Sequence, residues 1–88
     1  ANLDQKRVEL KIKTQAFNYL LEYYPRALGE TSPASEQNTW YFEAEVNANF
    51  YGLINFIMAN AEHVEILFPE ELKAVVRQRT NALLDKLK

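Results

Sequence analysis

Hydrophobic and polar residues alternate in three segments of the chain. VELKIK (residues 8–13), TWYFEAEV (residues 39–46) and HVEIL (residues 63–67) each place every second side chain in an apolar set. A period of two is typical of strands with one face buried. The inward positions are predicted to be Val8, Leu10, Ile12, Trp40, Phe42, Ala44, Val46, Val64 and Ile66. A fourth, shorter strand is expected within residues 29–36, as a partner for the strand at residues 39–46.

Between these segments the apolar spacing changes to a helical period. TQAFNYLLEYYP (residues 14–25) and NANFYGLINFIMAN (residues 47–60) carry apolar residues at i, i+3, i+4 and i+7. The predicted inner stripes are Phe17, Leu20, Leu21 and Tyr24 in the first helix, and Phe50, Leu53, Ile54 and Ile57 in the second.

Polar residues at the ends of these segments predict where the helices begin and end. Thr14 is expected to cap the first helix, with Pro25 near its end, and Asn47 or Asn49 is expected to cap the second. Asn60 is expected in the left-handed conformation that often follows a helix.

A third helix is predicted after Phe68-Pro69. Proline suits the first turn of a helix, and Glu70 and Glu71 complement the helix dipole there. The apolar face of this helix is predicted to consist of Leu72, Val75, Val76, Leu83, Leu84 and Leu87.

The resulting order, β-α-β-β-α-β plus a terminal helix, predicts an α+β fold. It is expected to be a ferredoxin-like two-layer sandwich with both inner helices on one face of an antiparallel sheet. The first and third strands are then central neighbours. Lys11 and Lys13 are expected to lie across from Glu43 and Glu45 on the open face.

Length and composition narrow the class of protein. The 88 residues are expected to form one domain, 1–88, and the net charge of −2 provides no general attraction to DNA or anionic lipid. There is no cysteine for a disulfide or a thiolate zinc site. No apolar run reaches the roughly 18 residues of a membrane span, and no signal-peptide pattern is seen. We expect a cytoplasmic domain with no membrane partner, excised from a longer protein because the chain opens on Ala1.

Residues able to carry chemistry are few. Glu43 and Glu45 are spaced like paired catalytic carboxylates, but a solvated sheet face explains them better. Glu62, His63 and Glu65 are spaced so that their side chains point apart, which disfavours a metal site. No nucleophile can be assigned a histidine partner, and two glycines cannot build a phosphate loop. We therefore expect no enzyme activity, catalytic residue, metal or cofactor.

The terminal helix carries the clearest positive charge. Lys73, Arg77 and Arg79 are the candidate contact with nucleic acid or a partner, although an ordinary solvated helix face explains them better. An aromatic platform for bases is disfavoured, because Trp40 and Tyr24 belong to inward sets and Tyr41 lies among glutamates.

Taken together, the strand VELKIK, the helix end YYP, the strand WYFEAEV and the junction VEILFPEELK (residues 64–73) resemble a known family. The pattern is similar to the C-terminal extension (WCX) domain that follows the WYL domain in bacterial transcriptional regulators. The resemblance spans residues 8–87. It departs from the family at NFIMAN, where Asn60 stands for the usual glycine and Phe56 for an aromatic anchor.

The resemblance implies a regulatory domain that takes part in effector sensing and dimer contacts. The implied partners are the WYL and helix-turn-helix domains of the same chain, a second copy, and a small-molecule or single-stranded nucleic-acid effector. Two alternatives stay open: a stand-alone ferredoxin-like module that binds a small molecule, and a single-stranded nucleic-acid binder that uses the basic terminal helix.

Overall fold

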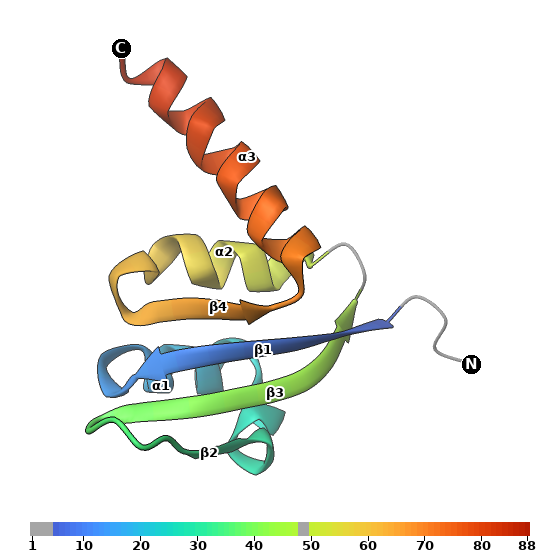
Figure 1. Cartoon of the computed structure of the whole chain (residues 1–88), viewed down its shortest axis with the longest axis vertical. Helices are drawn as coiled ribbons and strands as arrows, with labels where there is room; N and C mark the ends of the chain where they lie inside the picture. The colour runs from blue at the N-terminus through green and yellow to red at the C-terminus, as the bar shows by residue number, and fades with distance from the viewer. Residues whose placement is uncertain (1–4, 48–49) are drawn as a thin grey trace.

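The computed structural model describes residues 5–47 and 50–88, which form a sheet, two helices that cover it and a terminal helix that projects from the body (Figure 1). In chain order the elements are β1 (Gln5–Lys13), α1 (Thr14–Tyr23), β2 (Thr31–Pro33), β3 (Thr39–Asn47), α2 (Tyr51–Ala59), β4 (Val64–Phe68) and α3 (Glu70–Lys86). Short 3-10 turns, Pro25–Glu30 and Ala61–His63, precede β2 and β4.

The four strands form an antiparallel sheet in the order β2-β3-β1-β4. The first and third strands are central neighbours, as predicted, and β2 is the short strand expected within residues 29–36. This mixed α+β arrangement is compatible with the predicted ferredoxin-like sandwich with an extra C-terminal helix.

A single apolar cluster lies between the sheet and the two helices. The alternating residues of β1 are fully buried, and those of β3 are buried or half-buried, so both predicted inward faces are confirmed. The core residues are Val8, Leu10, Ile12, Ala16, Leu20, Ala27, Phe42, Ala44, Phe50, Leu53, Ile54, Phe56, Ile57 and Leu72. The other face of the sheet carries mostly polar residues and is uncovered by the described elements.

The predicted charge pairing between β1 and β3 was wrong in its register. Lys11 lies opposite Tyr41, and Lys13 opposite Thr39, whereas Glu43 faces Glu9. A period-two pattern decides which face a residue occupies, but registers that differ by two residues leave those faces unchanged. The register therefore depends on how the whole strand packs against its neighbours. The alternation of apolar and polar residues does not encode that packing.

The predicted capping role of Thr14 was also wrong. The Thr14 side chain makes no cap hydrogen bond. Its hydroxyl donates to the carbonyl oxygen of Asn38 at 3.3 Å and accepts from Nε1 of Trp40 at 3.2 Å. The Thr14 backbone N–H also donates to Asn38, at 2.9 Å. Thr14 thus joins the start of α1 to the start of β3. The two lie together because Lys13, at the end of β1, pairs with Thr39, at the start of β3.

The ends of α2 differ from the expectation as well. Phe50, at φ 56°, precedes the helix, and its N–H donates to the backbone oxygen of Asn47 at 2.9 Å without a side-chain cap. Asn49 lies outside the described residues. Asn60 has φ −125° and is not left-handed; its Nδ2 instead donates to the Phe56 carbonyl at 3.0 Å. A side-chain hydrogen bond therefore satisfies the last turn without left-handed backbone.

Candidate interaction surface on the terminal helix

Helix α3 is anchored to the body at its first turn, where β4 ends. The Pro69 carbonyl accepts hydrogen bonds from the N–H groups of Leu72 and Lys73 at 3.2 and 3.4 Å, so Pro69 stands immediately before the helix. Glu70 and Glu71 occupy the first turn, as predicted, and Leu72 is completely buried. The VEILFPEELK stretch therefore forms the junction that fixes the base of α3.

Contact with the body ends about halfway along α3. Val75 and Val76 are half-buried, and the Thr80 hydroxyl donates to the Val76 carbonyl at 2.8 Å and contacts Sδ of Met58 in α2 at 3.8 Å. Every residue from Arg77 to Lys88 is exposed. We call this stretch, residues 77–88, the overhang; in Figure 1 it rises away from α2 to the C-terminus.

The overhang exposes three leucines. Leu83, Leu84 and Leu87 are 51%, 53% and 73% exposed, although the spacing predicted that they would pack with Leu72 and Val76. That part of the prediction was wrong, because α3 is longer than the body beneath it. The apolar stripe continues the face that holds Leu72, but it meets no element among the described residues.

The structure does not bring the three predicted basic residues onto one face. Lys73 forms an ion pair with Glu70 at 3.2 Å, while Arg77 and Arg79 are exposed on the overhang. At about 100° per residue, Arg77 and Arg79 point roughly 160° apart around the helix axis. Positive charge is thus distributed around α3 rather than gathered into one patch.

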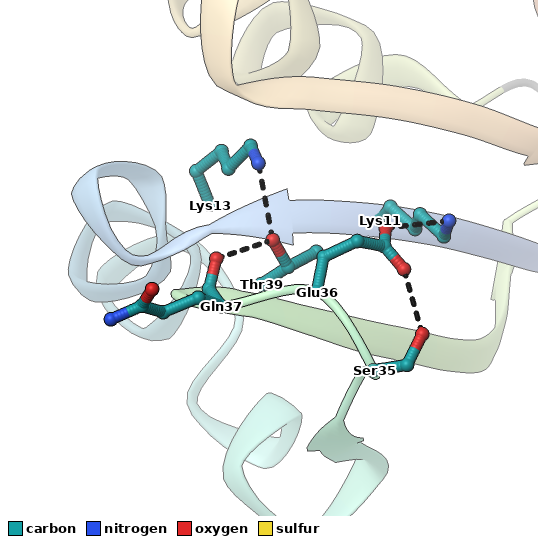
Figure 2. Close-up of polar contacts among 6 residues, drawn as sticks. All are labelled: Lys11, Lys13, Ser35, Glu36, Gln37 and Thr39. Carbon is teal, nitrogen blue, oxygen red and sulfur yellow. Dashed lines mark hydrogen bonds and ion pairs between the residues drawn. The ribbon is translucent and has the colours of Figure 1, made fainter.

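The sequence did not predict the polar cluster at the β2–β3 end of the sheet (Figure 2). Lys11 Nζ donates to the Glu36 carboxylate at 2.7 Å, and Ser35 donates to Glu36 at 3.0 Å. Lys13 Nζ donates to the Thr39 hydroxyl at 3.2 Å, which in turn donates to the Gln37 carbonyl at 3.1 Å. Lys11, Lys13, Glu36 and Thr39 border a shallow, open cavity that residues 62–65 also line.

The Lys11–Glu36 contact changes the acidity of both groups. The hydrogen bonds from Lys11 and, to a smaller extent, from Ser35 hold the pKa of Glu36 below its usual value. The same hydrogen bond with Glu36 raises the pKa of Lys11. Since both ions are partnered, this cluster ties the β2–β3 loop to the central strand β1.

The residues considered for catalysis or metal binding remain apart. Glu43 is exposed and lies 3.2 Å from Nε of Arg7, an ion pair of the open sheet face. Within residues 5–47 and 50–88, no three His, Cys, Asp or Glu side chains gather as metal ligands. His63 is half-buried beside the exposed Glu62 in the turn before β4.

Two aromatic side chains occupy the open sheet face, and sequence reasoning missed one of them. Tyr41 is 40% exposed, with Nζ of Lys11 5.7 Å from its ring centroid. Phe68 is 46% exposed, with the Arg7 guanidinium 5.4 Å from its ring. Strict alternation from Val64 points Phe68 inward, but an irregularity in the β1–β4 pairing places it opposite Glu9.

Comparison with known proteins identifies no relative. No protein-family model, curated protein or solved structure matches this chain. None of the helices in the described part of the chain is long and apolar enough to cross a membrane.

Proposed function

We propose that this chain is a regulatory and oligomerisation domain of a bacterial WYL-type helix-turn-helix transcriptional regulator, equivalent to its WCX extension. In this proposal the domain is cytoplasmic, has no enzyme activity and takes part in effector sensing and dimer contacts. Its partners are the WYL and DNA-binding domains of the same chain. The order of elements and the placement of VEILFPEELK at the strand-to-helix junction support the resemblance.

The overhang of α3 is the observation that carries the proposal. Isolated helices shorter than about 12–15 residues are only marginally stable in water. A helix end that exposes Leu83, Leu84 and Leu87 is therefore better suited to a contact with another surface than to isolation in solvent. A domain whose most apolar exposed feature projects from its body has the shape of an interaction module.

The two alternatives have weaker support. The shallow cavity beside Lys11, Lys13 and Thr39 supports a stand-alone small-molecule module, but it is open and its Lys11 is already paired. The single-stranded nucleic-acid alternative relies on the basic terminal helix, but Lys73 pairs with Glu70, and Arg77 and Arg79 point to opposite sides of the helix. On the open sheet face, the cations beside the exposed aromatic rings, Lys11 and Arg7, already pair with carboxylates.

A fusion experiment tests the proposal. The chain is joined to a DNA-binding domain that represses a reporter promoter only as a dimer, and repression is measured in bacteria. We expect the fusion to repress, because an oligomerisation domain supplies the missing dimer contact. A fusion that accumulates as folded protein but leaves the promoter fully active would contradict the oligomerisation role.

A further inference from the structure

We infer that the overhang is a docking surface for a second copy of this chain. In the inferred dimer two overhangs pack antiparallel about a two-fold axis near Leu83 and Leu84. Leu87 of each copy then lies toward Met58 of the other. The inference rests on the proposed oligomerisation role and names the surface that performs it.

The position of the apolar stripe is the first support. Leu83 and Leu87 continue the same helix face as Val76 and Thr80, and Thr80 contacts Met58. Met58 also lines a shallow groove formed by residues 58–63 at the end of α2. The exposed leucines and this groove are therefore neighbours on one continuous surface. A second copy that covers the exposed leucines therefore also contacts the groove.

Charge complementarity identifies the occupant. The overhang holds Arg77, Arg79, Lys86 and Lys88 against Asp85 alone, a formal charge of +3. Because the whole chain carries −2, the other 76 residues carry −5. The body of a second copy thus attracts the overhang, and the groove at residues 58–63 includes the exposed Glu62.

The acidic body favours the antiparallel orientation. Like charges meet between the overhangs in either orientation: a parallel pair places Lys86 and Lys88 beside their own equivalents, and an antiparallel pair brings them near Arg79 and Arg77 of the other copy. An antiparallel pair carries Lys86 and Lys88 of each copy toward the acidic body of the other. Such an arrangement is two-fold symmetric, so each copy contributes the same surface and the dimer closes without further growth.

Light scattering after size exclusion tests the surface on the whole chain. We expect the mass of the wild-type chain to rise with concentration from 10.3 kDa toward twice that value. The double variant Leu84→Glu/Leu87→Glu should stay at 10.3 kDa. Leu28→Glu is the matched control, because Leu28 is 68% exposed but lies in the turn before β2, and it should behave as wild type. Trp40 fluorescence verifies that each variant keeps a folded body.

Charge reversal tests the orientation. Lys86→Glu/Lys88→Glu should weaken dimerisation by about tenfold or more, and higher salt should weaken the wild-type dimer. No loss of affinity in this variant would overturn the antiparallel arrangement.

Cross-linking provides a second measurement that does not depend on destabilising the helix. The chain has no cysteine, so Leu84→Cys introduces a single thiol near the proposed axis. We expect oxidation to produce a disulfide-linked dimer with Leu84→Cys, and none with Leu28→Cys. Equal cross-linking of the two variants would overturn the inference.

The outcomes separate this inference from the proposal on which it rests. A dimer that survives Leu84→Glu/Leu87→Glu overturns the docking surface and leaves the oligomerisation role intact. A wild-type chain that is monomeric at every concentration overturns both. A monomer that instead binds anionic vesicles through the overhang also overturns the inference, because the amphipathic helix then serves a membrane surface.

Discussion

Glu36 shows how a single loop residue contributes to the fold. It lies in the loop between β2 and β3, and its carboxylate accepts a hydrogen bond from Lys11 of β1 at 2.7 Å (Figure 2). Nothing in the local pattern of LGETSPASEQNT distinguishes Glu36 from its polar neighbours. Its pairing with Lys11 depends on the position of the loop against β1, which the local sequence does not specify.

The Glu36 ion pair predicts a dependence on pH. Its pKa is below the ordinary value of 4.5, so the folded state favours the carboxylate. The stabilisation is present above the unfolded pKa and is lost as the pH falls through the folded pKa. A carboxyl-carbon NMR titration should show Glu36 titrating below 4.5, and Lys11→Met should move its pKa upward.

Ser35→Ala serves as a graded control for this prediction. It removes the weaker of the two side-chain hydrogen bonds and should raise the pKa of Glu36 by less than Lys11→Met does. A Glu36 pKa that is the same in the wild type and in Lys11→Met would show that the ion pair does not form in solution.

Gly52 permits a close approach between α1 and α2. A Cβ atom at this position would come within 2.7 Å of Cζ of Tyr23, whose ring stacks on Phe56 with the centroids 6.4 Å apart. An alanine must therefore displace the Tyr23 ring, although alanine is intrinsically better in a helix than glycine by about 1 kcal/mol.

A double-mutant cycle isolates this contact. Gly52→Ala should stabilise the Tyr23→Ala variant by up to about 1 kcal/mol. It should stabilise the wild type less or not at all, because there the alanine must displace the far end of the Tyr23 ring, which is 44% exposed. The free energies come from urea unfolding curves. Equal effects in both backgrounds would mean that Tyr23 does not limit the space at Gly52.

At the scale of the element, α3 is divided into an anchored half and an exposed half. The same apolar periodicity runs through both halves, but Leu72 is fully buried and Leu87 is 73% exposed. Length explains the difference, since 17 helical residues extend about 26 Å. The body beneath the helix ends near Met58, so the later turns pass beyond it.

Alanine substitution should reveal this division. Leu72→Ala should cost about 2–5 kcal/mol of unfolding free energy, as for a buried leucine. Leu87→Ala should change it by no more than about 0.5 kcal/mol in dilute samples where the chain is monomeric. Urea unfolding measures both values. A large loss for Leu87→Ala at high dilution would mean that the overhang packs on its own body.

At the scale of the whole molecule, charge is separated between an acidic body and a basic helix end. The overhang carries +3 and the rest of the chain −5. The overhang charges surround the helix, because Arg77 and Arg79 point away from each other. The net negative charge of the body disfavours contact between the body and a nucleic-acid backbone.

This distribution predicts weak binding to single strands. In a fluorescence-anisotropy titration with a short labelled strand, we expect no saturable binding at moderate salt and only weak binding at low salt. Arg77→Glu/Arg79→Glu is the matched variant. Tight binding that falls steeply with salt and vanishes in this variant would favour the nucleic-acid alternative over the dimer.

The sequence by itself determined the order of elements, the inward faces of β1 and β3 and the inner stripe of α2. These depend on the local periodicities of two and 3.6 residues, which the backbone geometry of a strand or a helix sets. The central pairing of β1 with β3 also followed, because few topologies accommodate that order of elements.

Only the tertiary structure decided the partners across those faces. The register opposes Lys11 to Tyr41 rather than Glu43, because shifts of two residues preserve the pattern of alternation. Phe68 faces outward because the pairing of β4 with β1 is irregular at Glu9. Leu83, Leu84 and Leu87 are exposed because α3 extends beyond the body that supports it. Each of these outcomes depends on the length and position of a second element. The local spacing of residues in the first element contains no information about either.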